Sequence, residues 1–140
     1  MITCTRRIQF CSGHRVFGHE GKCRHLHGHN YVAFITAEAE ELDSVGRVID
    51  FSVLKELVGG WIDRNWDHGC VLWAGDTEAL LAVKACQPSK IFELPNNPTA
   101  ENMADFLLLI VCPAVLKETG VVVTKIVLWE TENCYAETTL

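Results

Sequence analysis

The sequence lacks an excess of positive charge, a paired set of cysteines and a long hydrophobic run. Its formal net charge of -6 argues against nucleic-acid binding, because proteins of that class neutralise phosphates with a basic face. The seven cysteines contain no CxxC pair, and an odd number cannot pair completely. The longest apolar run, residues 106–116, is about half a membrane span and contains Pro113, so we interpret it as part of a buried helix.

Length and composition fit a single globular domain. The chain has 140 residues, of which 49% are hydrophobic and 21% charged, without repeats or low-complexity tracts. Residues 1–7 lack the apolar run of a secretory signal, and unpaired thiols suit a reducing compartment. We therefore expect one domain over residues 1–140, in a soluble cytoplasmic protein. Its expected partner is a small molecule, rather than a nucleic acid or a membrane.

Strands are predicted toward both ends of the chain, because apolar and polar residues alternate there with a period of two. The segments with this pattern are residues 2–11, 30–39, 121–130 and 134–138. A loop rich in glycine and charge separates the first two segments. We expect these two to pair as an antiparallel hairpin.

Three helices are predicted between the second and third strands. Asp50 can cap a helix with apolar residues at helical spacing through residue 62, and Thr77 can cap a shorter one. Thr99 is expected to cap a third helix that Pro113 stops. This order of elements indicates an α+β fold, with the helices packed on one face of a four-stranded antiparallel sheet. The two open edges of such a sheet predict an oligomer.

His27-Gly28-His29 is the most informative motif. Side chains at positions i and i+2 of a strand point to the same side, so both imidazoles can bind one metal ion. His14 lies thirteen residues before His27, and a hairpin can deliver it as a third ligand. Three neutral histidines with an open fourth position are the donor set of a catalytic zinc site. We therefore predict a Zn²⁺ site at His14, His27 and His29, and expect His25 to be a loop residue that faces away from the metal.

Cys23 lies four residues before His27. A nearby metal ion can lower the pKa of a thiol, and this would make Cys23 a usable base. Two other interpretations stay open. The site could be a structural zinc site with Cys23 as fourth ligand, or the motif could be a chance pair of surface histidines.

Four further residues are candidates for catalysis or substrate binding. Asp67 precedes His68, and an aspartate can fix the tautomer and orientation of a histidine in a proton relay. Glu130 falls in the apolar row of its strand, where a carboxylate is costly unless it is paired or bound to a ligand. Thr99 begins a helix, where exposed amides suit an anion or a polar ring. Each has a plainer alternative. The Asp67–His68 pair could be part of a solvated loop, Glu130 could lie at a strand end that turns into solvent, and Thr99 could be an ordinary helix cap.

Six short motifs occur in order over nearly the whole chain. They are Phe10-Cys11-Ser12-Gly13-His14, Cys23-Arg24-His25-Leu26-His27-Gly28-His29-Asn30-Tyr31, Val48-Ile49-Asp50-Phe51, Asp67-His68, Pro98-Thr99-Ala100-Glu101-Asn102 and Trp129-Glu130-Thr131. Together they resemble the 6-pyruvoyl-tetrahydropterin synthase / 6-carboxytetrahydropterin synthase family. Two positions depart from that pattern. Residues 69–73 replace the Leu-Asn that often follows the Asp-His pair, and Gly13 stands where alanine is common.

The resemblance implies a T-fold enzyme that acts on 7,8-dihydroneopterin triphosphate. It implies, by matching motifs, the zinc ligands His14, His27 and His29, the proton acceptor Cys23, the relay residues Asp67 and His68, the ring anchor Glu130 and a further contact, Thr99. The family assembles as hexamers of two stacked trimeric rings with active sites between subunits. A homohexamer, with its sheets closed into a barrel, is therefore expected.

The Cys-x3-His-Gly-His spacing resembles the 6-carboxytetrahydropterin synthase branch of queuosine and deazapurine biosynthesis, whose products are 6-carboxytetrahydropterin, acetaldehyde and triphosphate. The alternatives are a 6-pyruvoyl-tetrahydropterin synthase, which eliminates triphosphate from the same substrate, and a catalytically idle zinc-binding assembly subunit. A cupin-like metal enzyme also uses His-x-His, but its all-β pattern conflicts with the helical segments here. The cations that could hold the triphosphate are Arg15, Lys22, Arg24 and Lys90.

Overall fold

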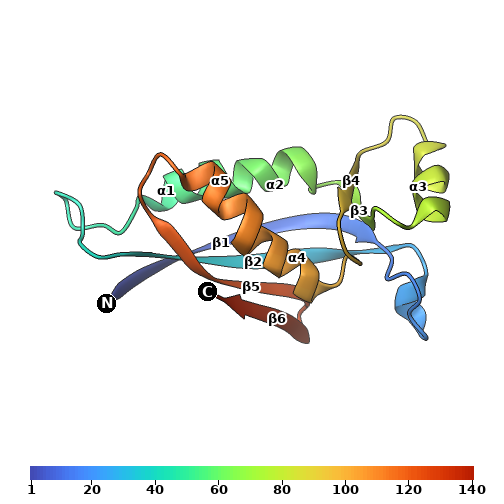
Figure 1. Cartoon of the computed structure of the whole chain (residues 1–140), viewed down its shortest axis with the longest axis horizontal. Helices are drawn as coiled ribbons and strands as arrows, with labels where there is room; N and C mark the ends of the chain where they lie inside the picture. Colours follow the sequence, from blue (N-terminus) through green and yellow to red (C-terminus); the bar gives the residue numbers. More distant parts are fainter.

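A six-stranded sheet forms the body of the protein in the computed structural model, which describes residues 1–140 (Figure 1). The strands are β1 (Ile2–His14), β2 (His27–Ala39), β3 (Gly69–Trp73), β4 (Ile91–Leu94), β5 (Val122–Thr131) and β6 (Cys134–Thr139). They lie in the order β4-β3-β1-β2-β5-β6. The pairs β1–β2, β2–β5 and β5–β6 are antiparallel, whereas β1–β3 and β3–β4 are parallel.

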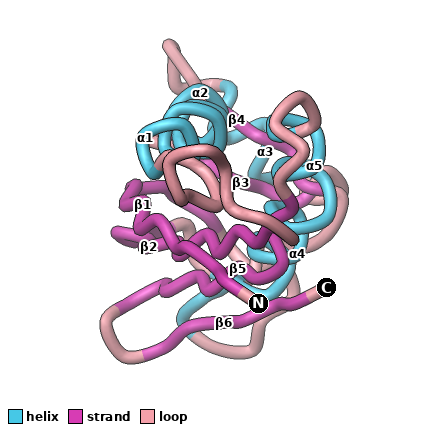
Figure 2. The backbone as a smooth tube through the Cα atoms, turned by 90° about the vertical axis from the view of Figure 1, so that its left-hand side faces the viewer, coloured by secondary structure: helices cyan, strands magenta, loops and turns pink.

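Two interrupted helices cover one face of this sheet (Figure 1), and the tube in Figure 2 shows the same layering from the end. The first consists of α1 (Phe51–Leu54), the π-helical segment η2 (Lys55–Gly59) and α2 (Gly60–Asn65), and the second of α4 (Ala100–Phe106), the π-helical segment η3 (Leu107–Val111) and α5 (Cys112–Leu116). A short helix, α3 (Thr77–Lys84), lies apart from them beside β3 and β4, and the 3-10 turn η1 (Lys22–Arg24) joins β1 to β2. None of these helices combines the length and apolarity needed to cross a membrane.

The core between the helices and the sheet extends to the end of the β1–β2 hairpin. Phe10 of β1 stacks on Tyr31 of β2 with ring centroids 5.1 Å apart, and Trp66 lies against Phe10 at 5.9 Å. All three side chains are buried. Gly59 of η2 passes close to β1, since a Cβ there would lie 3.6 Å from Ile8 Cδ1. This buried aromatic packing supports the end of the β1–β2 hairpin.

The α+β class and the four antiparallel strands agree with the sequence prediction, but the strand count of four is wrong. The added strands, β3 and β4, extend the sheet from β1 by parallel pairing. They are only five and four residues long, and the apolar run at 70–73 has no alternation to mark it as a strand. β1 also continues to His14 and β2 begins at His27, so the hairpin is longer than the predicted 2–11 and 30–39.

Two of the predicted helix boundaries also need correction. Asp76, rather than Thr77, caps α3, because its carboxylate accepts the N–H of Ala79. Pro113 does not stop the third helix, which continues through α5 to Leu116. Pro113 follows the π-helical segment η3, where the hydrogen-bond register changes and a missing N–H is tolerated. The caps predicted at Asp50 and Thr99 are confirmed. The seven cysteines are free, as their number and scatter predicted.

Replacement of Asp76 by asparagine is expected to lower the free energy of unfolding by about 3 kcal/mol, since it breaks a buried ion pair. Asp76 is 1% exposed and accepts two hydrogen bonds from Arg15, at 2.5 and 2.6 Å. The Arg15 hydrogen bonds lower the pKa of Asp76 in spite of burial. The pair therefore stabilises the fold above the unfolded-state pKa, and this stabilisation is lost as pH falls through the lower folded-state pKa. Urea unfolding at several pH values measures the free energy of unfolding and its dependence on pH.

The matched control for this change is Glu78→Gln. Glu78 also contacts Arg15, at 3.3 Å, but its side chain is 85% exposed, and exposed ion pairs contribute little. Equal destabilisation by the two substitutions would contradict the role of burial at Asp76.

Candidate metal centre and active site

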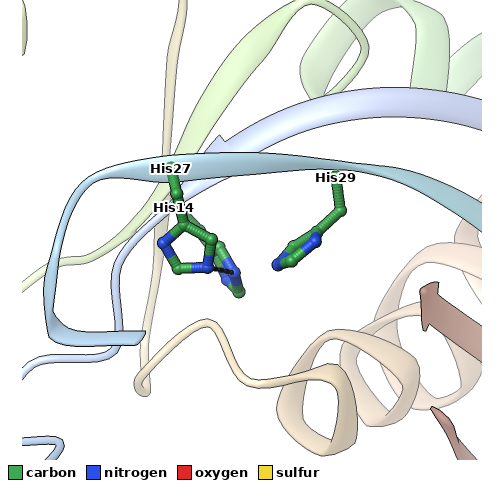
Figure 3. A group of neighbouring side chains, drawn as sticks. All are labelled: His14, His27 and His29. Atoms are coloured by element: carbon green, nitrogen blue, oxygen red, sulfur yellow. Dashed lines mark hydrogen bonds between the residues drawn. The ribbon is translucent and has the colours of Figure 1, made fainter. Parts of the chain in front are cut away.

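The register of the β1–β2 hairpin brings the three predicted metal ligands together. His14, at the end of β1, lies directly opposite His27, at the start of β2. His29 follows two residues later and points to the same face as His27. One ring nitrogen from each residue lies within 4.8 Å of the others, and Figure 3 shows the three rings turned toward one space. The cluster is therefore a direct product of strand pairing and strand parity.

Backbone carbonyl groups orient two of the rings. Nδ1–H of His14 donates to the carbonyl of Pro98 at 2.7 Å, and Nδ1–H of His27 donates to the carbonyl of His25 at 2.6 Å. In the neutral rings Nε2 is then unprotonated, and the two Nε2 atoms face each other at 3.2 Å (Figure 3). Two unprotonated nitrogens at this distance repel each other, and a metal ion bound between them would relieve this repulsion. Such carbonyl partners are the usual second contacts of metal-bound histidines.

Burial favours the neutral form of the His14 and His29 imidazoles. It lowers the pKa of His14 to about 4, and the hydrogen bond to Pro98 only partly opposes this effect. Burial also lowers the pKa of His29, against the opposing charge of Glu130. A neutral imidazole at pH 7 keeps the lone pair that a metal ion needs.

The donor set also fits a metal ion. His29 Nε2 is buried and has no hydrogen-bond partner, and an orphaned buried nitrogen is costly. Three neutral imidazoles suit a divalent transition metal such as zinc. His14, His27 and His29 can therefore hold a metal ion, and coordination would satisfy the orphaned nitrogen.

Glu130 lies beside this cluster, at the same end of the sheet. It shares a face of β5 with Ile126 and Leu128, which are fully buried. Its Oε1 is 3.5 Å from Nε2 of His29. Glu130 therefore does not turn away into solvent, and its carboxylate can accept hydrogen bonds from N–H groups of a molecule bound at the cluster.

Tyr31 is a site residue that the sequence analysis did not single out for a role. Its ring lies 5.9 Å from that of His14 and 5.6 Å from that of His29, between centroids. The hydroxyl is buried without a partner. Burial raises the pKa of Tyr31, and the charges of Glu130 and Cys23 raise it further. Tyr31 has the same strand parity as the two histidines of the motif, and that parity was the signal available in the sequence.

Cys23 lies in η1, the turn between the two long strands. Its carbonyl accepts the N–H of Val16 at 2.8 Å, and this bond ties the turn to the loop after β1. The thiol is free and half-buried, and its negative charge is one of the causes that raise the pKa of Tyr31. Cys23 thus lies in the surroundings of the histidine cluster and is not one of the three residues that compose it.

Asp67 and His68 form a second cluster, with Cys11. Nδ1–H of His68 donates to Asp67 Oδ2 at 2.8 Å, and the N–H of Cys11 donates to Asp67 Oδ1 at 3.0 Å. Burial favours the neutral form of Asp67, but these hydrogen bonds outweigh it and lower its pKa. Strand alternation puts Cys11 on the opposite face of β1 from His14. Within one chain, therefore, the relay pair clusters with Cys11 and not with Cys23.

The start of α4 touches the metal cluster. Thr99 caps the helix, since its Oγ1 accepts the N–H of Asn102 at 3.1 Å, and the preceding carbonyl of Pro98 holds His14. The cap interpretation of Thr99 is confirmed, and its hydroxyl keeps a donor for a further contact.

Two of the four candidate cations are engaged elsewhere in the fold. Arg15 is bound to Asp76, and Lys90 Nζ donates to the backbone carbonyls of Asp63 and Asp67 at the end of α2. The other two, Lys22 and Arg24, flank Cys23 in η1. They are the cations adjacent to the predicted proton acceptor.

Known proteins match this sequence over nearly its whole length. The model of the family described as 6-pyruvoyl tetrahydropterin synthase matches residues 3–139. A protein of Rickettsia bellii named 6-carboxy-5,6,7,8-tetrahydropterin synthase is 45% identical over 137 residues, covering 98% of this chain and 99% of the relative. A Haemophilus influenzae protein of the same name is 30% identical, covering 98% of each chain.

Solved structures share the fold. An uncharacterized protein of Wolinella succinogenes superposes with a TM-score of 0.82 at 22% identity, over 99% of this chain and 97% of the other. The Caenorhabditis elegans 6-pyruvoyl tetrahydropterin synthase superposes with a TM-score of 0.74, also at 22% identity, over 99% and 95%. Family match, full-length relatives and fold agree, and this chain belongs to the 6-pyruvoyl tetrahydropterin synthase family of enzymes.

Proposed function

We propose that this protein is a zinc-dependent lyase that converts 7,8-dihydroneopterin triphosphate and water to 6-carboxy-5,6,7,8-tetrahydropterin, acetaldehyde and triphosphate. The observation that carries the proposal is the three-histidine cluster, with Glu130 beside His29 and Cys23 in the turn that joins the two strands of the ligands. Relatives named 6-carboxy-5,6,7,8-tetrahydropterin synthase match the chain from end to end. The Cys-x3-His-Gly-His spacing of residues 23–29 favours this branch over the pyruvoyl-forming one.

The chain's own residues supply binding and proton transfer. Zinc, when bound to His14, His27 and His29, supplies Lewis-acid polarisation of the substrate's hydroxyl-bearing side chain. Glu130 accepts hydrogen bonds from the pterin ring and fixes its orientation. Cys23 takes up the proton released from the side chain.

In the proposed reaction, Asp67 and His68 act in an active site that forms when subunits assemble. Because they cluster with Cys11 on the other face of β1, one chain alone does not join them to Cys23. A homohexamer with active sites between subunits would supply the pair from a neighbouring copy. The open edges of the sheet at β4 and β6 support such an assembly.

Product analysis with zinc-loaded protein tests the proposal. Incubation with 7,8-dihydroneopterin triphosphate is expected to release acetaldehyde and triphosphate in equal amounts, and 6-carboxytetrahydropterin is expected in the pterin fraction. Liquid chromatography with mass spectrometry, together with an enzymatic acetaldehyde assay, measures all three.

The alternatives give different results in the same experiment. Triphosphate without acetaldehyde would identify a pyruvoyl-forming synthase. Tight zinc binding without consumption of the pterin would identify an idle assembly subunit, and either result would overturn the proposed reaction. Heat-denatured protein at the same zinc concentration is the control for metal-catalysed breakdown of the substrate.

A further inference from the structure

The side chain of Asn97 forms hydrogen bonds with both main-chain groups of Phe17, a residue 80 positions earlier in the sequence. Its Oδ1 accepts the N–H of Phe17 at 2.9 Å, and its Nδ2–H donates to the carbonyl of Phe17, also at 2.9 Å. One side-chain amide thus pairs with a loop residue as the main chain of a neighbouring strand would. The segment before α4 is joined in this way to the loop after β1, residues 15–21.

The same loop holds the turn that carries Cys23. The N–H of Val16, next to Phe17, donates to the carbonyl of Cys23 at 2.8 Å, and the carbonyl of Val16 accepts the N–H of His19 at 3.1 Å. No residue of η1 is buried, and residues 24–26 after Cys23 are exposed. Because packing contributes little at this turn, hydrogen bonds to the loop fix the position of Cys23.

The main chain around Asn97 is held independently of its side chain. The carbonyl of Asn97 accepts the N–H of Thr99 at 2.8 Å and an Nδ2–H of Asn102 at 2.9 Å. The next residue, Pro98, is buried, and its carbonyl accepts Nδ1–H of His14 at 2.7 Å. This short segment therefore orients a predicted metal ligand through its main chain and the loop after β1 through one side chain.

We propose that Asn97 is a positioning residue for Cys23, an inference that rests on the proposed role of Cys23 in proton transfer. Asn97 acts through the main chain of Phe17 and Val16, and so fixes the thiol relative to the segment that orients His14. A proton acceptor must lie within hydrogen-bond reach of its donor. A shift of about 1 Å in an active site can lower the rate about 100-fold. The side chain of Asn97 therefore determines how much of the catalytic contribution of Cys23 is realised.

The loop also has two contacts that do not involve Asn97. Arg15 is paired with the buried Asp76, and the ring of Phe17 lies 5.4 Å from that of Trp73, between centroids. These contacts keep the loop on the protein when the Asn97 side chain is changed. A substitution at Asn97 is therefore expected to shift the main chain locally and to leave the fold intact.

Asn97→Asp tests the proposal, because a carboxylate has the shape of the amide but no N–H to donate. It places an oxygen, instead of a donor, against the carbonyl of Phe17. The N–H of Val16 is expected to exchange with deuterium at least about tenfold faster, and kcat to fall about 10- to 100-fold, with zinc content unchanged. Asn96→Asp is the matched control, since it adds the same charge at the exposed neighbouring residue and should leave all three quantities unchanged.

A double-substitution cycle with Cys23→Ala separates positioning from a general structural role. Asn97→Asp is expected to lower kcat in the original protein but not in Cys23→Ala protein, because the thiol on which it acts is gone. An equal further loss in Cys23→Ala protein would overturn the proposal, as would unchanged kcat, loss of zinc or unchanged exchange at Val16 in the Asn97→Asp variant. The exchange measurement uses no substrate. Failure of the positioning role is therefore distinguishable from failure of the proposed reaction, which product analysis of the unsubstituted protein detects.

Discussion

Cys23→Ala is expected to lower kcat by about 10² to 10⁴, the usual contribution of a positioned acid or base, while the full complement of zinc is retained. Cys23 lies in the turn η1, which joins the strands that carry His14 and His27, and its negative charge contributes to the raised pKa of Tyr31. His14, His27 and His29 form the metal cluster without it. The loss should therefore fall on the chemical step and leave the metal in place. Steady-state kinetics and metal analysis of the same preparation measure both quantities.

The control for this substitution is Cys86→Ala. Cys86 is also a free thiol, but it is exposed after α3, and its replacement should leave kcat and zinc content unchanged. If Cys23→Ala protein lost its zinc, Cys23 would be a metal ligand, and the structural-site interpretation would replace the catalytic one. A kcat within a factor of about three of the original would remove Cys23 from proton transfer.

The local parts of the fold could be predicted from the sequence, and the non-local parts could not. Alternation and caps identify the β1–β2 hairpin, the strands β5 and β6 and the helix starts at Asp50 and Thr99, because these depend on neighbours in the chain. The strand β3 pairs in parallel with β1, more than fifty residues away in sequence, and leaves no short-range pattern. Pro113 misleads for a related reason, since the π-helical segment that accommodates it depends on packing and not on propensity.

The same division applies to the site. The spacing of His27 and His29 is a property of one strand, and the hairpin adds His14 by register. The groups that aim these rings are the carbonyls of Pro98 and His25, and a backbone carbonyl has no signature in a sequence. The clustering of Cys11 with His68 likewise requires the parallel β1–β3 pairing to be known. Sequence patterns therefore identify ligands more readily than the contacts that orient them.

His27→Ala is expected to weaken zinc binding by more than about 100-fold, since even partners that only orient a ligand are worth about 10- to 100-fold. His27 Nε2 faces His14 Nε2 at 3.2 Å, so loss of His27 leaves two metal-ligating nitrogens and one more open coordination position. Turnover should fall to the level of metal-free protein at one equivalent of zinc per chain. Competition with a zinc-sensitive dye measures the affinity, and the acetaldehyde assay measures turnover.

His25→Ala separates the role of a ligand from that of a nearby histidine. The ring of His25 is exposed, and only its backbone carbonyl contacts His27, so this variant should bind zinc as the unsubstituted protein does. Equal loss of zinc from both variants would mean that the η1 turn, and not the imidazole of His27, holds the metal. An unchanged zinc affinity in His27→Ala would contradict the three-histidine metal centre on which the proposed reaction depends. Because His27 lies at the start of β2 and outside the buried core, both proteins should fold, and thermal melts of the zinc-free forms would verify it.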